Sequence, residues 1–223
     1  MSRIGTQAPV ARCTLILVRH AHTDLAGRFC GQIDPPLSAQ GLAQLPDLNQ
    51  RLSTHSLTHI FSSDLQRTLQ TAEPIAQRTK LPIQRQSSLR EFAFGTWEGL
   101  DWDQVVARDS DYAQRWLDLY PSIPAPGGEH FSDFRKRIQD AMNAIADQVQ
   151  DGCAAVVTHA GVIRTFLGDL AGLRHAPSDF SEFGYTSCWE VWHEQGHWSL
   201  PGETASASAC DGLRQMSDGG HRA

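Results

Sequence analysis

The residue types best suited to chemistry gather in the segment LVRHAHT, which runs from Leu17 to Thr23. Arg19 and His20 directly follow an apolar run, residues 14–18, whose branched side chains favour a buried strand. In parallel α/β sheets, ligands bind in the crevice outside the carboxyl ends of the strands. An isolated Arg-His pair is more typical of a surface, so a functional interpretation needs support from the rest of the chain.

Two further predicted strands end in residues of the same kinds. Arg67 follows a short strand expected at residues 58–61, and His159 follows an apolar strand expected at 153–157. Ser63 and Gln66 form a capping-box pattern, which predicts that a helix starts there and carries Arg67 in its first turns. We therefore expect one crevice to hold both arginines and both histidines.

Such a set suits a phosphoryl group. An arginine fork matches phosphate oxygens with short, charge-assisted hydrogen bonds, and neutral histidine is a competent nucleophile toward phosphorus. The backbone N–H groups of Ala160 and Gly161, at the start of a predicted helix, would add a further anion site.

The remaining elements indicate how these groups are positioned. We expect a helix after Ser38 that Pro46 kinks or restarts, a third strand near 81–85, helices within 101–120, a clear amphipathic helix from 131 to 149, and an edge hairpin at 187–192 and 197–200. Strands that alternate with helices predict an α/β fold, a single-domain three-layer α/β/α sandwich with a mainly parallel sheet. Its expected limits are residues 12–200, after a flexible N-terminal lead-in (1–11) and before a disordered C-terminal tail (201–223).

Composition narrows the class of partner. The formal net charge of -6 argues against nucleic acid or an anionic membrane, which need a basic surface, and leaves a small molecule or another protein. The five cysteines show no zinc or disulfide spacing, and we see neither a secretory signal nor a membrane-spanning apolar run. We expect a cytoplasmic protein whose oligomeric state the sequence does not indicate.

Several motifs, taken together and in order, resemble the histidine phosphatase superfamily, which includes the cofactor-dependent phosphoglycerate mutases. They are LVRHAHT at Leu17, GQIDPPLS at Gly31, SSDLQRTLQTAEPIA at Ser62, LREFAFGTWEG at Leu89, PGGEHFSDFRKR at Pro126 and VVTHAGVIR at Val156. The resemblance runs from about residue 14 to 198.

This resemblance implies a role for each matching residue. His20 would be the nucleophile that becomes phosphorylated, and Glu91 would be the proton donor. Arg19, Arg67 and a protonated His159 would bind the phosphoryl oxygens. The expected substrate-binding residues are Thr23, Gly31, Gln32, Ala160 and Gly161. The scheme requires no metal and no cofactor.

Three positions depart from the family pattern. Ala21 stands where glycine is usual, His22 where glutamate is common, and Ala26 where many members have a phosphate-contacting asparagine. The last departure weakens one binding contact but leaves the nucleophile, the arginines and the acid in place.

The choice between hydrolysis and mutase-type transfer depends on the segment after Glu91. It carries more acidic than basic residues, which would repel the carboxylate that a phosphoglycerate mutase must hold, so we favour a phosphomonoesterase. The aromatic residues there form either a lid over an organic leaving group or simple helix packing. The GQIDPPLS, PGGE and GTWEG stretches look most like α-ribazole phosphatases, which makes α-ribazole 5'-phosphate a candidate substrate.

Other classes stay open. A member that only binds phosphorylated ligands would be favoured if His20, Arg67 or His159 were missing, and all are present. A metal site is the other rival, but His193 and His197 straddle the predicted hairpin turn and fit a solvated surface. Lys136 and Arg137 are expected on the solvated face of their amphipathic helix.

Overall fold

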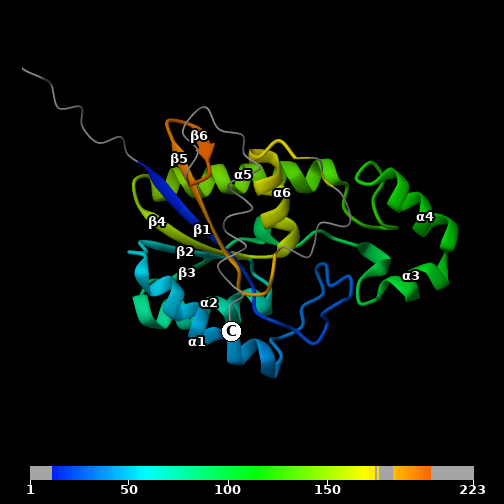
Figure 1. The fold of residues 1–223 in the computed structure, drawn as a ribbon, viewed down its shortest axis with the longest axis horizontal. Helices are drawn as coiled ribbons and strands as arrows, with labels where there is room; N and C mark the ends of the chain where they lie inside the picture. Colours follow the sequence, from blue (N-terminus) through cyan, green and yellow to red (C-terminus); the bar gives the residue numbers. More distant parts are fainter. Residues whose placement is uncertain (1–11, 174, 176–182, 202–223) are drawn as a thin grey trace, which may run out of the picture.

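The computed structural model describes residues 12–173, 175 and 183–201, which form a six-stranded sheet between helical layers (Figure 1). In chain order the elements are β1 (Cys13–Arg19), α1 (Ala39–Arg51), η1 (Leu52–Thr54), β2 (His59–Ser62), α2 (Gln66–Thr79), β3 (Ile83–Arg85), η2 (Ser87–Leu89), η3 (Gly95–Trp97), α3 (Trp102–Arg108), α4 (Ser110–Leu119), α5 (Phe131–Val149), β4 (Cys153–Thr158), α6 (Ala160–Leu170), β5 (Cys188–Glu194) and β6 (His197–Ser199). The three-layer α/β/α architecture expected from the sequence is confirmed.

The sheet has the strand order β3-β2-β4-β1-β5-β6. The first four strands in this order are parallel, whereas β5 pairs antiparallel with β1, and β6 pairs antiparallel with β5. The expected edge hairpin is therefore present. The parallel strands β2, β4 and β1 lie side by side, so their carboxyl ends meet at one edge.

Alternating side chains of β1 explain the two layers of helices. Leu15 and Leu17 belong to the larger core cluster, which includes Phe134 and Ile138 of α5. Ile16 and Val18, on the other face, pack in a second cluster with side chains of α1 and α2. The period of two residues thus assigns α5 and α6 to one face and α1 and α2 to the other (Figure 1).

Two expectations about helices were wrong. Pro46 lies inside an unbroken α1; because it is exposed, water can satisfy the carbonyl that loses its helical partner. The capping box at Ser63 does not form: α2 begins at Gln66, its N-cap Leu65 makes no side-chain cap bond, and the Ser63 hydroxyl contacts His159 instead. By contrast, the side chain of Ser38 caps α1 as expected.

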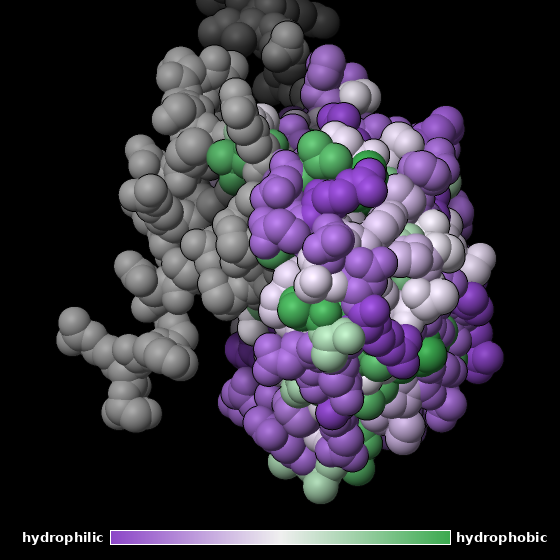
Figure 2. Space-filling model, turned by 90° about the vertical axis from the view of Figure 1, so that its right-hand side faces the viewer, coloured by the Kyte–Doolittle hydropathy of each residue, from purple (hydrophilic) through white to green (hydrophobic). Residues whose placement is uncertain are grey.

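Residues 97–120, called the cap below, form a helical extension at one end of the molecule (Figure 1). Trp97, Trp116 and Val105 are buried in it, but Val106, Leu117 and Leu119 are exposed. The face of the molecule at this end is mainly hydrophilic, with small hydrophobic areas (Figure 2).

The expected lead-in and almost all of the expected tail lie outside the described residues. Within the part of the chain that the structure covers, no helix has the length and apolar character needed to cross a bilayer.

Candidate active site

The pairing of three strands brings the predicted groups together. Arg19, the last residue of β1, pairs with Thr158 of β4, and the N–H of His20 donates to the carbonyl oxygen of Thr158 at 2.9 Å. On the other side of β4, the N–H of Ser63 donates to the carbonyl oxygen of Val157 at 3.0 Å. The chain after each strand therefore enters the same crevice, as the sequence predicted.

His20 is buried, and its ring is oriented by its own backbone. The Nδ1 atom lies 2.7 Å from the carbonyl oxygen of Ala21. Because a carbonyl can only accept, Nδ1 carries the ring proton and Nε2 keeps its lone pair. Burial, together with the charges of Arg67 and Arg19, lowers the pKa of His20 well below its usual range. His20 is thus neutral, the form that a nucleophilic histidine requires.

His159 is completely buried beside His20, with ring centroids 5.2 Å apart. Burial, together with the charge of Arg67, lowers the pKa of His159 well below its usual range. This direction favours a neutral His159 beside His20, and the protonated form that the resemblance implies for phosphoryl binding stays a prediction. Its Nε2 lies 3.0 Å from Ser63 Oγ, and its Nδ1 has no partner among the described residues.

Arg67 is fully buried in the first turn of α2 and is fixed by the loop that precedes α1. It donates from Nη1 to the carbonyl oxygen of Ile33 and from Nη2 to that of Gly31, both at 2.7 Å. Its Nε atom lacks a hydrogen-bond partner within the described chain. Gly31 thus acts here by its carbonyl group, which orients the guanidinium.

Arg19 is held by two residues that the sequence analysis did not select. Its Nη1 donates to the carbonyl oxygen of Phe183, and its guanidinium lies over the Tyr185 ring at 3.8 Å from the centroid. Tyr185 also packs against His20, with centroids 5.7 Å apart. Nε of Arg19 is buried and has no partner in the described structure. No sequence signal marked Tyr185, because it follows none of the predicted strands.

Glu91 reaches the same crevice from the irregular segment between η2 and η3. Its Oε1 accepts from the N–H of Phe92 at 2.8 Å, and its Oε2 accepts from the N–H of Gly161 at 3.0 Å. The Gly161 N–H, expected to bind substrate, is therefore engaged by the carboxylate. The absence of a side chain at Gly161 is also necessary, since a Cβ there would lie 2.1 Å from Glu91 Oε1.

Four of these side chains line a cavity of about 690 Å³, whereas His159 and Gly161 lie behind its wall and are not part of its lining. Thr23, Gly31 and Ala160 lie on its wall, together with Arg19, His20, Arg67 and Glu91. Gln32 does not: its N–H donates to Glu98 Oε1 at 3.0 Å, and its side-chain oxygen accepts from Arg90 at 3.4 Å. His22 is also directed elsewhere, with Nδ1 2.8 Å from the Oγ of Ser38.

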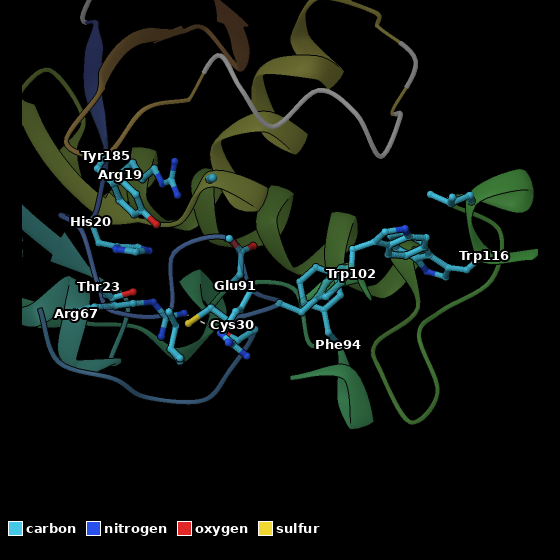
Figure 3. Close-up of a pocket in the computed structure, with 17 residues that line it drawn as sticks. Arg19, His20, Thr23, Cys30, Arg67, Glu91, Phe94, Trp102, Trp116 and Tyr185 are labelled. Atoms are coloured by element: carbon cyan, nitrogen blue, oxygen red, sulfur yellow. Dashed lines mark hydrogen bonds between the residues drawn. The ribbon is translucent and has the colours of Figure 1, made fainter. Parts of the chain in front are cut away.

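The cavity has two chemically different ends (Figure 3). Arg19, His20, Thr23 and Arg67 lie at one end, and Trp102 and Trp116 lie at the other. The second end, called the distal pocket below, is lined by Trp102, Trp116 and Leu117 of the cap, by Phe94, and by Arg28 and Phe29 of the loop after β1, which contact the cap. The cap aromatics therefore serve both expected purposes, because Trp97 and Trp116 are core residues while Trp102 and Trp116 also face the cavity.

Arg137 also differs from its expected place on a solvated helix face. It is partly buried and forms an ion pair with Glu129, with Nε 2.7 Å from Oε1. Helical periodicity gave no hint of this pairing, but Glu129 belongs to the PGGE stretch, so that motif carried the available signal.

Across residues 12–173, 175 and 183–201, no group of three or more His, Cys, Asp or Glu side chains is arranged to hold a metal ion. His193 packs its ring against Trp198 at 4.6 Å between centroids, and His197 is exposed on β6.

Comparison with known proteins agrees with this geometry. The family model of the histidine phosphatase superfamily (branch 1) matches residues 15–203. The chain belongs to this superfamily. The chain is 30% identical over 176 residues to phosphoserine phosphatase 1 of Hydrogenobacter thermophilus, a match that covers 78% of this chain and 81% of that protein. The family expected from the motifs is confirmed.

Other relatives carry different names. A Proteus mirabilis protein named "Probable phosphoglycerate mutase GpmB" is 32% identical over 159 residues, which cover 70% of this chain and 74% of that protein. The crystal structure of the alpha-ribazole phosphatase from Shigella flexneri has a TM-score of 0.74 at 22% identity and covers 84% of this chain and 94% of that chain. The latter likeness establishes the shared fold.

Proposed function

We propose that this histidine phosphatase is a phosphomonoesterase that hydrolyses a small phosphorylated metabolite through a phosphohistidine on His20. One observation carries the proposal. The buried Nε atoms of Arg19 and Arg67 and the Nδ1 atom of His159 lack partners in the described structure. These three residues lie near His20, a neutral histidine whose Nε2 lone pair is free to attack. Buried polar atoms normally have partners, so a ligand that supplies acceptors at this point accounts for them.

In the first step, Nε2 of His20 attacks phosphorus and the ester P–O bond breaks. Glu91 protonates the oxygen of the leaving alcohol, while Arg19, Arg67, His159 and Thr23 bind the phosphoryl oxygens. In the second step, Glu91 takes a proton from water, which attacks phosphorus and breaks the P–N bond. Inorganic phosphate leaves and His20 returns to its neutral form.

Hydrolysis is favoured over mutase-type transfer by the charge of the cap. A mutase must hold a second anionic group, but the cap carries five aspartates against two arginines: Asp101, Asp103, Asp109, Asp111 and Asp118 against Arg108 and Arg115. Arg28, the cation that lines the distal pocket, is already engaged by Gly99, Gln104 and Asp101. Such a surface repels a phosphoglycerate carboxylate.

The distal pocket supports an organic, ring-bearing leaving group. Trp102, Trp116, Phe29 and Phe94 offer apolar faces against which a planar ring can pack. This environment and the name of the Shigella flexneri neighbour make α-ribazole 5'-phosphate the candidate substrate. We further propose that the protein acts in the cytoplasm without a metal or cofactor.

A panel of phosphomonoesters tests the function. We expect phosphate release from α-ribazole 5'-phosphate to exceed release from 3-phosphoglycerate and phosphoserine, and a chelator to have no effect. His20→Ala should abolish turnover and acid-labile protein phosphate, while His197→Ala, which removes an exposed histidine far from the crevice, should retain both. Net phosphate transfer between the oxygens of phosphoglycerate would favour the mutase, and phosphate binding without turnover would favour a non-catalytic member.

A further inference from the structure

Arg137 directs most of its guanidinium N–H groups to the segment that carries Glu91. Nη1 donates to the carbonyl oxygens of Ser88 at 2.9 Å and Arg90 at 2.8 Å, and Nη2 donates to that of Glu91 at 3.0 Å. The remaining contacts go to Glu129, from Nε at 2.7 Å and from Nη2 at 3.0 Å. All five N–H donors of the arginine are therefore occupied, three of them by the backbone of residues 88–91.

Glu129 connects the same segment on its other side. Its carboxylate accepts from the N–H of Ala93 at 3.4 Å, and its own N–H donates to the carbonyl oxygen of Ala93 at 2.9 Å. The ion pair thus forms hydrogen bonds with the chain both before and after Glu91. With side chains only 22% and 16% exposed, the pair is shielded enough for its hydrogen bonds to be rigid.

The segment that carries Glu91 depends on these hydrogen bonds because it has little regular secondary structure of its own. Between Leu89, where η2 ends, and Gly95, where η3 begins, no helix or strand is present. The ladder hydrogen bonds that fix His20 and His159 on the sheet are therefore absent at Glu91. α5, which is long and packs its apolar face into the core, supplies a fixed point from which Arg137 can reach the segment.

We propose that Arg137 and Glu129 are positioning residues that hold the Glu91 carboxylate at the distance needed for proton transfer. The proposal rests on the proposed function, in which Glu91 is the general acid and base. Arg137 lies outside the lining of the cavity and touches no reacting atom. Replacement of Arg137 should therefore slow the step that needs proton transfer and should change substrate binding far less.

Leaving-group dependence separates this role from a merely structural one. Departure of 2-phenylethanol requires protonation by Glu91, whereas p-nitrophenolate leaves without it. We expect Arg137→Lys, which keeps the charge but has fewer donors in a different geometry, to lower kcat/KM for 2-phenylethyl phosphate by about 10²-fold. Phosphorylation by p-nitrophenyl phosphate should change only a few-fold, followed by accumulation of phosphohistidine because base-assisted hydrolysis is slow.

Arg135→Lys is the matched control. Arg135 lies on the same helix and pairs with Asp169 at 2.8 Å, and it has no contact with residues 88–91. Its kinetics on both esters should match those of the parent protein. Equal losses by Arg137→Lys on the two esters, or no loss on either, would overturn the proposal. If Arg137→Lys fails to fold, Glu129→Gln gives the same readout with the arginine contacts to the backbone retained.

The Glu91→Gln variant distinguishes a failure of the proposed role of Glu91 from a failure of the proposed role of Arg137. If it shows no selective loss on 2-phenylethyl phosphate, the proposed role of Glu91 fails. If it shows that loss and Arg137→Lys does not, the function stands and the positioning role of Arg137 is wrong.

Discussion

The contact between Gly161 and Glu91 makes Gly161→Ala a sharp perturbation. An alanine Cβ would lie 2.1 Å from Oε1 and 3.0 Å from Cδ of Glu91, whereas an ordinary contact begins at 3.4 Å. The carboxylate must therefore retreat by more than about 1 Å, and a displacement of that size in a catalytic group costs about 10²-fold in rate. This corresponds to about 2.7 kcal/mol of activation free energy.

The same substitution should leave the fold intact. Gly161 lies in the first turn of α6 and has no positive φ, so alanine suits its backbone and gains up to about 1 kcal/mol in helix propensity. The carboxylate also has space to enter, because a cavity of about 30 Å³ adjoins Glu91 and Gly161 on the side of Tyr120. We therefore expect unchanged or slightly higher stability together with a large loss of activity.

Two measurements check this prediction. Urea unfolding should give a free energy at least equal to that of the parent, and kcat/KM for 2-phenylethyl phosphate should fall about 10²-fold. On a Glu91→Gln background, Gly161→Ala should cost much less, because both changes act on one group. A near-normal kcat/KM for the single variant, or fully additive losses in the double variant, would refute the reasoning.

Three further outcomes are expected. Because the pKa values of His20 and His159 are lowered from 6.5, the unfolded chain binds protons below that pH that the folded protein does not. The free energy of unfolding should therefore be full above about pH 6.5 and fall below that pH by up to about 1.4 kcal/mol per pH unit for each histidine. Urea unfolding at pH 7.5 and 5.5 measures this decline, and an equal decline in a His20→Asn/His159→Asn variant would contradict the prediction. Trp102→Ala should raise the KM for 2-phenylethyl phosphate about tenfold and leave the KM for phosphoethanolamine nearly unchanged, because Trp102 lines the distal pocket. Equal effects on both esters would exclude a role for Trp102 in packing against the leaving group. Gly95→Ala should destabilise the protein by more than about 1 kcal/mol in urea unfolding, since φ is +55° and the new Cβ would lie 2.4 Å from the carbonyl carbon of Gly127 and from the carbonyl oxygen of Pro126. Retained stability would show that this backbone can shift.

The catalytic end of the cavity was predictable because its signals are local. Apolar runs that end in Arg19-His20 and in His159 mark strands and their carboxyl ends, and parallel pairing then brings those ends together. The place of Arg67 was predictable because a helix was expected to follow the next strand. That helix is present, although the sequence assigned it the wrong N-cap residue. Glu91 was identified from the family motifs alone, because no periodic pattern of the sequence marks it.

The positions that sequence reasoning missed depend on contacts between distant segments. Arg137 has the spacing of a solvent-facing helical residue, and only the approach of residues 88–91 shields it. Tyr185 covers Arg19 because β5 runs antiparallel to β1, and chain order does not reveal that pairing. Leu117 is the opposite case: it is a large apolar residue of a helix, yet it lines the cavity and is 38% exposed.

The cap occupies one uninterrupted stretch of chain, residues 97–120, while the reacting side chains come from segments spread between residues 19 and 159. Natural selection can therefore lengthen, shorten or replace the cap as a single genetic unit without altering the ends of β1, β2 and β4. The cap's share of the distal pocket and the proposed catalytic residues are thus encoded by separate parts of the gene. A lineage with this architecture can acquire new substrates while it inherits its catalytic apparatus unchanged.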